Sequence, residues 1–173
     1  MSQAFRLIEV QELSDDSYAS LARLLIDVVE DGASIGFLPP LQAEEATHYW
    51  RGVLAPDVKL WVAYKGEEPV GTVQLHLCMK ENGKHRAEIA KLMVHPSARR
   101  KGLAKRLMLE AETSAREEGR TLLILDTREG DPSNLLYRSL GYVEAGRIPR
   151  FARSANGELD GTVIYYKELD SVL

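Results

Sequence analysis

A short basic segment that contains a glycine constrains this chain most. Arg99-Arg100-Lys101-Gly102-Leu103-Ala104 follows the apolar run Ile89 to Val94 and opens a run with helical spacing, Leu103 to Glu118. A helix start leaves backbone N–H groups unpaired and carries a partial positive charge. The segment therefore predicts an anion site in which the basic side chains reach a pyrophosphate or a ribose phosphate. The alternative is a solvated basic helix start.

Length and charge favour one domain with a small-molecule partner. The chain has 173 residues, of which 45% are hydrophobic, which is enough for a single core spanning 1–173. Its formal net charge of -4 argues against binding to nucleic acid or to an anionic membrane surface.

Cysteine content and the apolar runs indicate the compartment. Cys78 is the only cysteine and lies in a strand-like run, so no intramolecular disulfide can form and a reducing compartment is expected. Met1 to Val10 lacks a basic region followed by an apolar stretch, and no apolar run approaches spanning length. We expect a cytoplasmic protein. Homodimers are common among small enzymes, but no interface signature is visible.

The order of elements predicts a mixed α/β sheet. The first half reads as strands and two helices, and the second half alternates strand and helix. The expected first half comprises a strand Phe5–Val10, a helix capped by Ser14, a loop Gly32–Pro40, a helix Leu41–Leu54, strands Lys59–Tyr64 and Val70–Met79, a hairpin-type turn Glu81–Lys84 and a strand ending at Val94. The expected second half comprises the helix after Gly102, strand Thr121–Asp126, helix Ser133–Leu140, and strands Tyr142–Ile148 and Thr162–Lys167.

The ordered set of these motifs resembles the acetyl-CoA-binding core of the GNAT N-acetyltransferases. The resemblance rests on a strand followed by Arg99-x-x-Gly102-x-Ala104, and then on a strand and a short helix that carries Tyr137 and ends in Gly141-Tyr142. It covers the chain from Phe5 to Leu169. It implies the GNAT fold, with a central twisted and mostly antiparallel sheet that is splayed at the strand carrying Val94 and flanked by helices. It also implies acetyl-CoA as cofactor and coenzyme A as product.

Further segments are similar to the tabtoxin-resistance branch of this family, which acetylates an amino-acid toxin containing a β-lactam. They are Gly32–Phe37, Ala87-Glu88, Lys91–Val94, Pro96–Arg99, Leu125–Thr127 and Thr162–Leu169. This similarity implies a small amino-acid-like or antibiotic-like amine as acceptor, with resistance by acetylation as its sharpest form.

The resemblance implies roles for three catalytic residues. An ammonium must lose its proton before it attacks a thioester, and Glu88 and Asp126 are the candidate bases, alone or together through water. Either carboxylate could instead be structural, at a strand end or as a cap. Tyr137 is implied as the acid that protonates the departing thiolate, with core packing as its alternative.

The resemblance also implies the cofactor contacts. Leu92 and Met93 would contact the pantetheine arm through main chain, and the backbone N–H of Val94 would meet the developing oxyanion. The segment Arg99 to Ala104 would hold the phosphates. Many members carry an asparagine seven residues before the tyrosine, but Gly130 stands there in this chain.

Other candidate residues are less specific. The four histidines lack metal-ligand spacing, so no metal site is expected. Phe37, Tyr49 and Trp50 could form walls of the acceptor pocket, with core packing as the alternative for each. A role for the segment Phe151–Arg153 near the other side of the cleft is equally open.

Two rival functions remain at this point. One keeps the fold but acetylates a protein N-terminus or a lysine side chain, although the apolar loop Ile35–Leu38 favours a cover over a small pocket. The other is a non-catalytic acyl-CoA sensor, against which the joint presence of Glu88, Asp126 and Tyr137 argues.

Overall fold

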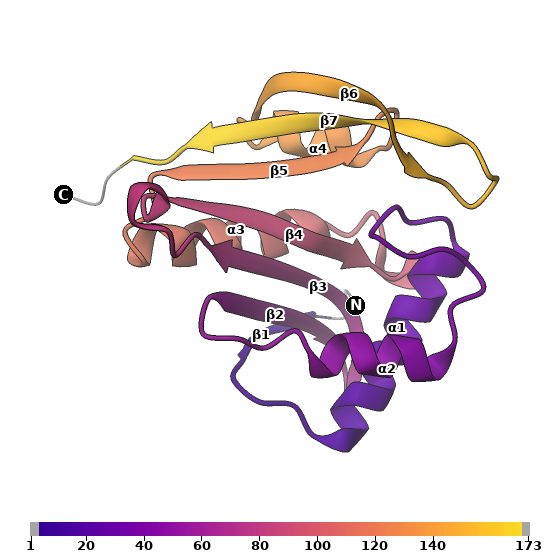
Figure 1. Cartoon of the computed structure of the whole chain (residues 1–173). Helices are drawn as coiled ribbons and strands as arrows, with labels where there is room; N and C mark the ends of the chain where they lie inside the picture. The colour runs from indigo at the N-terminus through magenta and orange to yellow at the C-terminus, as the bar shows by residue number, and fades with distance from the viewer. Residues whose placement is uncertain (1–3, 171–173) are drawn as a thin grey trace.

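The computed structural model describes residues 4–170 and arranges them as one seven-stranded sheet in the order β1-β2-β3-β4-β5-β7-β6 (Figure 1). The strands are β1 (Arg6–Val10), β2 (Val58–Lys65), β3 (Glu68–Leu77), β4 (Arg86–Val94), β5 (Leu122–Arg128), β6 (Val143–Arg153) and β7 (Leu159–Glu168). The helices are α1 (Asp15–Glu30), α2 (Ala43–Arg51), α3 (Leu103–Glu117) and α4 (Ser133–Ser139), with 3-10 turns η1 (Glu81–Gly83) and η2 (Pro96–Ala98). The expected mixed α/β sheet is confirmed.

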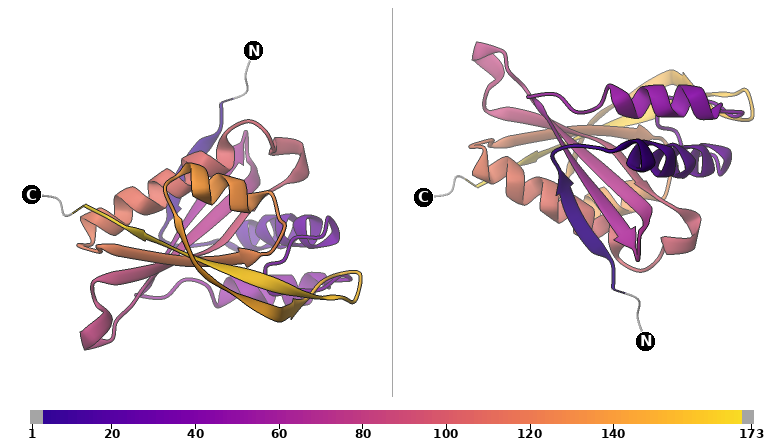
Figure 2. Two further views of the ribbon diagram at one scale, coloured as in Figure 1. Left: turned by 90° about the horizontal axis from the view of Figure 1, so that it is seen from above. Right: turned by 90° about the horizontal axis from the view of Figure 1, so that it is seen from below.

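The helices cover the two faces of the sheet separately (Figure 2). On one face, the apolar stripe of α3, including Leu103 and Leu107, packs with Leu75 and Leu123 of the strands and with Tyr137 of α4. On the other face, α1 and α2 pack against Leu60 and Val62 of β2. We call this second side the α1/α2 face. Each helix buries one apolar stripe, as an amphipathic helix on a sheet must.

The sheet is split between its two central strands. Among the strands of residues 4–170, β4 and β5 are the only parallel neighbours, and they pair at three positions, Arg86, Ala87 and Glu88 of β4. Beyond Glu88 the strands separate, whereas β3 continues to pair with β4 as far as Val94. The splayed, mostly antiparallel sheet expected at the strand carrying Val94 is therefore present.

A bulge interrupts β4 on the open side of the split. The register between β3 and β4 shifts between Thr72 and Gln74, and Lys91 takes a left-handed conformation with φ of 52°. The buried Thr72 hydroxyl donates a hydrogen bond of 2.9 Å to the Lys91 carbonyl. An extra residue in one strand bends it and increases its twist, which helps β4 to leave β5.

Several boundaries differ from the expected ones because distant partners decide them. The strand expected over 142–148 runs from Val143 to Arg153, since Ala152 and Arg153 pair with β7 after an irregularity. The strand expected to end at Asp126 continues to Arg128, paired with Thr162 of β7. Asp126 therefore lies inside a strand and not at its end.

Two further expectations are corrected near Cys78. The hairpin-type turn expected over 81–84 is the 3-10 helix η1, in which the Gly83 amide bonds to the Lys80 carbonyl at 2.8 Å. β3 ends at Leu77, so the partly buried Cys78 follows the strand instead of lying in it. The second helix is also shorter than expected, Ala43–Arg51.

Candidate active site

Glu88 and Asp126 lie on the same face of the sheet, on the two strands that separate. Directly paired residues share a face, and so do residues two apart along a strand. Leu60 packs with α1 and α2. Leu60 pairs with Gln74, and His76, two residues further along β3, pairs with Glu88, so Glu88 lies on the face of Leu60. Glu88 pairs with Ile124 of β5, and Asp126 is two residues further along that strand, so Asp126 lies on this face as well. Both carboxylates thus flank the opening of the split on the α1/α2 face.

The two carboxylates differ in their contacts. The Thr162 hydroxyl donates a hydrogen bond of 2.9 Å to the Asp126 carboxylate. Glu88 is exposed and makes no side-chain hydrogen bond or ion pair with any residue from 4 to 170. An exposed carboxylate without a partner is free to accept a proton from a ligand, whereas Asp126 is oriented by its neighbour.

Tyr137 lies on the other side of the separated β5, on α4. Its side chain is buried against Tyr142 and Tyr165, with both ring centroids 5.9 Å away. Burial is the largest cause that raises its pKa above the usual range, and the charge of Asp126 adds to the effect. The phenol therefore stays protonated throughout the physiological range, as a proton donor requires.

Asn134 serves the local structure and does not replace the missing asparagine at position 130. Its amide donates to the carbonyls of Arg128 and Asp131, at 3.0 and 2.8 Å, and its oxygen accepts from the Tyr165 hydroxyl at 2.8 Å. These bonds hold the turn before α4 and orient that helix. Gly130 occupies the turn with φ of 85°, a conformation that suits glycine.

The segment before α3 forms a nest of backbone N–H groups. Arg100 and Gly102 have φ of 58° and 74°, which turns the chain sharply into the helix. Within the described part of the chain, the amides of residues 100–105 have no backbone acceptor, whereas the Arg106 amide bonds to the Gly102 carbonyl at 3.1 Å. Successive unpaired amides at a helix start bind anions. The geometry agrees with the predicted phosphate site.

The basic side chains of this segment are not all free. Arg99 forms an ion pair of 2.5 Å with Asp31 of the α1 terminus and donates to the Val94 carbonyl at 3.1 Å. Lys101 donates to the Ser97 carbonyl at 3.1 Å. Arg99 thus joins the segment before α3 to the end of α1. Among the three expected basic side chains, only that of Arg100 has no hydrogen bond or ion pair within residues 4–170.

A partly buried polar chain on the α1/α2 face was not expected from the sequence. Gln74 donates to the Tyr49 hydroxyl at 2.9 Å, and its oxygen lies 2.8 Å from Nε2 of His76. Burial lowers the His76 pKa, the negative charge of Glu88 opposes this shift, and the positive charge of Lys91 adds to it. Only the pairing of β3 with β4 and the packing of α2 bring these residues together.

The aromatic residues proposed as pocket walls separate into two groups. Phe37 and Tyr49 are partly buried and pack edge to face with ring centroids 5.1 Å apart. Trp50 is fully buried and belongs to the core. Of the two roles left open for Trp50, the structure supports core packing, while Phe37 and Tyr49 border the loop between α1 and α2.

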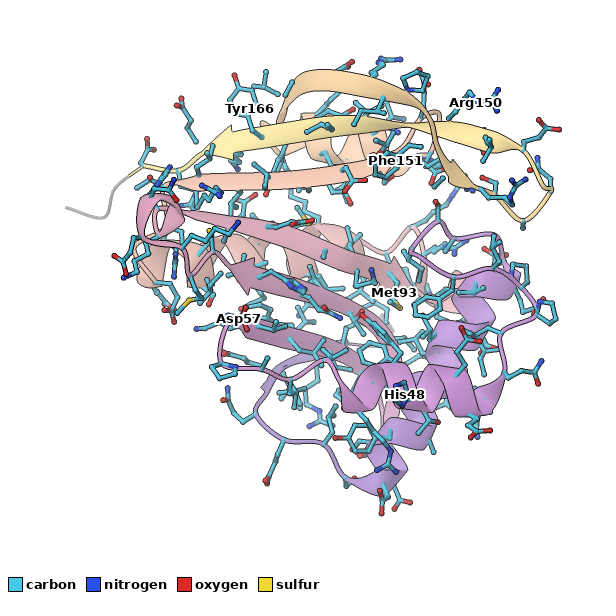
Figure 3. All side chains as sticks on the ribbon, viewed as in Figure 1. His48, Asp57, Met93, Arg150, Phe151 and Tyr166 are labelled. Atoms are coloured by element: carbon cyan, nitrogen blue, oxygen red, sulfur yellow. The ribbon has the colours of Figure 1, made fainter. Side chains whose placement is uncertain are left out.

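Arg128 connects three segments around the open end of the split. Its guanidinium donates to the Asp131 carboxylate at 2.9 Å, to the Ser154 hydroxyl at 3.0 Å and to the Gly32 carbonyl at 3.0 Å. It therefore fixes the loop after α1 to the β6–β7 hairpin. In Figure 3, Met93 of β4 and Phe151 of β6 lie in the two halves of the molecule that Arg128 joins. Phe151 is 54% exposed.

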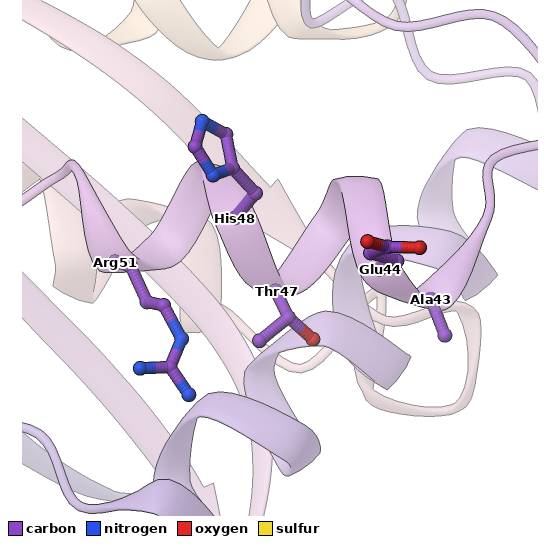
Figure 4. Close-up of a pocket in the computed structure, with 5 residues that line it drawn as sticks. All are labelled: Ala43, Glu44, Thr47, His48 and Arg51. Atoms are coloured by element: carbon purple, nitrogen blue, oxygen red, sulfur yellow. The ribbon is translucent and has the colours of Figure 1, made fainter.

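A separate hollow lies on α2, away from these residues. It is lined by Ala43, Glu44, Thr47, His48 and Arg51 (Figure 4). All five belong to one helix, and Glu88, Asp126 and Tyr137 do not line the hollow.

Among residues 4–170 no group of three His, Cys, Asp or Glu side chains could hold a metal ion. No helix in the same range is long and apolar enough to cross a membrane.

Comparison with known proteins assigns the family. The model of the acetyltransferase (GNAT) family matches residues 15–142, which include the split, the nest and Tyr137. The chain belongs to the GNAT family. The expected GNAT fold is confirmed by the structural neighbours.

Relatives of this GNAT protein come from several bacteria. It is 36% identical over 106 residues to an "uncharacterized N-acetyltransferase in hisH-hisA intergenic region" from Azospirillum brasilense, and the match spans 60% of this chain and 63% of that relative. An N-acetyltransferase from Staphylococcus aureus Mu50 superposes with a TM-score of 0.81 at 13% identity, over 96% of this chain and 99% of that one. A Salmonella typhimurium protein solved with its cofactor acetyl-CoA gives 0.77 at 15% identity, over 96% and 95% of the chains.

The residues present fit acetyl-CoA, the acyl donor of GNAT enzymes. The unpaired amides of residues 100–105 offer donors for phosphate oxygens. The unpaired edge of β4 beyond Glu88 offers main chain to an extended arm. The nest follows this edge along the chain after the short turn η2, so one ligand could place its extended arm along β4 and its phosphates at the nest.

Proposed function

We propose that this GNAT protein transfers the acetyl group of acetyl-CoA directly to the primary amine of a small amino-acid-like or antibiotic-like acceptor. The observation that carries the proposal is the placement of Glu88 and Asp126 on one face at the opening of the split, with the amide nest at the end of β4. When bound, acetyl-CoA supplies an acetyl thioester, a group that is reactive towards a neutral amine.

Glu88 is the proposed base. It is exposed at the split, has no competing partner within residues 4–170, and can accept the proton of an incoming ammonium directly or through water. Asp126, held by Thr162, adds negative charge that favours the ammonium and can share the proton through water. The C–N bond then forms as the proton passes to this pair of carboxylates.

Tyr137 is the proposed acid. As the C–S bond breaks, its hydroxyl donates the phenolic proton to the departing thiolate, and its raised pKa keeps that proton available. The N–H of Val94 would stabilise negative charge on the acyl oxygen, while the main chain of Leu92 and Met93 would hold the pantetheine arm. The segment Arg99 to Ala104, including the nest amides from Arg100 through Gly102 and Leu103, would bind the phosphates, with Arg100 and Lys101 adding charge.

A small acceptor is supported by the cover over the α1/α2 face. The loop Gly32–Pro40 is fixed by Arg128 and borders Tyr49 through Phe37. The similarity to the tabtoxin-resistance branch supports an amino-acid-like toxin as one such acceptor and a role in resistance.

We propose the cytoplasm as the place of action, because the chain has one cysteine and can form no intramolecular disulfide.

Calorimetric titration with acetyl-CoA, followed by thiol release across a panel of amines, tests the function. The panel contains free amino acids, β-lactam amino acids, polyamines and short peptides. Binding with thiol release from a small amine is the expected result. Absence of acetyl-CoA binding would refute the proposal, and acetylation of peptides alone would replace the small acceptor with a protein.

A further inference from the structure

Lys91 is a charged residue beside the split that the proposed chemistry does not use. It occupies the bulge of β4 with φ of 52°, a left-handed conformation that L-residues other than glycine rarely adopt. The Thr72 hydroxyl, on a fully buried side chain, holds the Lys91 carbonyl at 2.9 Å. The backbone at this position is therefore fixed, and the direction of the side chain follows from it.

The Lys91 ammonium lies under the loop between α1 and α2. A Cβ placed on Gly36 would lie 3.8 Å from Lys91 Nζ. The side chain is partly buried, yet it makes no hydrogen bond or ion pair with any residue from 4 to 170. Charged groups removed from water are normally paired. The structure thus holds a cation at this position without a protein anion beside it.

Neighbouring residues place this cation in the same region as the proposed base. Gly36 lies over Lys91, and the next residue, Phe37, packs against Tyr49. Through space, both Lys91 and Glu88 act on His76, with opposite signs. Lys91 and Glu88 therefore present one positive and one negative charge on the α1/α2 face, both near His76.

We propose that Lys91 binds the carboxylate of the acceptor, so that the acceptor is a free amino acid or a closely similar zwitterion. This inference rests on the proposed function, because Glu88 must receive the ammonium of the same molecule. A zwitterion matches the two side-chain charges, and its carboxylate gives the Lys91 ammonium the partner that the protein lacks. In a peptide, the carbonyl group next to the terminal amine belongs to an amide and carries no charge, so a peptide offers Lys91 no carboxylate at that position.

The test compares amino acids with their carboxamides. Thiol release is measured for glycine, alanine, methionine and phenylalanine and for the four matching amides, with wild type, Lys91→Met and Lys91→Arg. Lys80→Met is the matched control, since Lys80 is exposed and its side chain has no partner within residues 4–170. Acetyl-CoA affinity and the thermal midpoint are measured for each variant.

Lys91→Met is expected to lower kcat/KM for the acids by about 10- to 100-fold, the effect of one charge-assisted hydrogen bond, and for the amides by less than about 3-fold. Lys91→Arg retains the preference for acids, and Lys80→Met has no effect. The ratio of kcat/KM for each acid to kcat/KM for its amide is compared between the variant and the wild type. This comparison removes the effect of the different amine pKa values of acid and amide, because that difference is the same for both proteins.

Other results overturn the inference. Equal losses for acids and amides, or weaker acetyl-CoA binding with an unchanged ratio, would assign Lys91 to the cofactor. If amines without a carboxylate were acetylated and the amino acids were not, the carboxylate site would be refuted, but the acetyltransferase function would stand. Failure of the wild type to bind acetyl-CoA or to acetylate any amine would refute both proposals.

Discussion

Arg128 provides the sharpest structural prediction, because one side chain joins three segments. We consider Arg128→Met, which keeps an unbranched apolar stem and removes the guanidinium with its donors. The three acceptors are the carboxylate of Asp131, the hydroxyl of Ser154 and the carbonyl of Gly32. Ser154 keeps its hydrogen bond to Asp160, but the carbonyl of Gly32 loses the side-chain donor that ties it to the rest of the molecule.

The expected cost follows from these contacts. An unsatisfied carbonyl costs about 1–2 kcal/mol. The lost hydrogen bond to the Ser154 hydroxyl, which keeps Asp160 as a partner, costs about 0.5–1 kcal/mol. The ion pair with Asp131 is partly exposed, with side chains 22% and 26% accessible, so solvent screening limits its contribution to about 0.5–1 kcal/mol. We expect Arg128→Met to lower the free energy of unfolding by about 2–4 kcal/mol.

Urea unfolding and amide hydrogen exchange measure the two consequences. The free energy of unfolding should fall as stated, and exchange should accelerate in the loop Gly32–Pro40 more than in the core strands. Arg23→Met on the exposed side of α1 is the control and should change neither quantity. A loss below about 0.5 kcal/mol with unchanged loop exchange would show that Arg128 does not hold the loop.

Three further predictions concern catalysis and the core. Tyr137→Phe should lower kcat by about 100-fold with unchanged acetyl-CoA affinity in calorimetry, and an unaltered rate would exclude the acid role. Burial raises the Tyr137 pKa above its ordinary value of 10.0, so wild-type kcat should not fall through loss of the phenolic proton as the pH rises to 10. A decline of kcat with a midpoint near pH 9 that is absent in Tyr137→Phe would contradict the raised pKa. Leu107→Ala empties a fully buried position on α3 and should cost about 2–5 kcal/mol in urea unfolding, whereas a cost below about 1 kcal/mol would show that the core repacks around the gap.

The central features of the fold could be predicted because they rest on local patterns. The basic segment with Gly102 marks the start of α3, and the apolar spacing that follows marks its buried stripe. The order of strands and helices then limits the topology to a mixed sheet. The length of β6 could not be predicted in this way, because its last residues pair with Asp160 and Leu159 across an irregular stretch.

The polar part of the site was predicted less completely. Glu88, Asp126 and Tyr137 were expected from motifs, and the structure brings the two carboxylates to one face. The polar chain from Tyr49 through Gln74 to His76 joins α2 to β3, and no pattern along the sequence links these positions. Arg128 and Gly32 are likewise far apart in the chain and meet only in the folded structure.

The pH dependence of thiol release in Glu88→Gln tests the central claim most directly. A base is needed only while the amine is protonated, which holds below a pKa of about 10 for an aliphatic ammonium. We expect Glu88→Gln to lower the rate about 100-fold at pH 7, with a loss that diminishes towards pH 10, and we expect a smaller loss for Asp126→Asn. The proposed proton transfer would be contradicted if both single variants and their double variant kept the wild-type rate at pH 7. An equal loss at every pH in Glu88→Gln would contradict it as well.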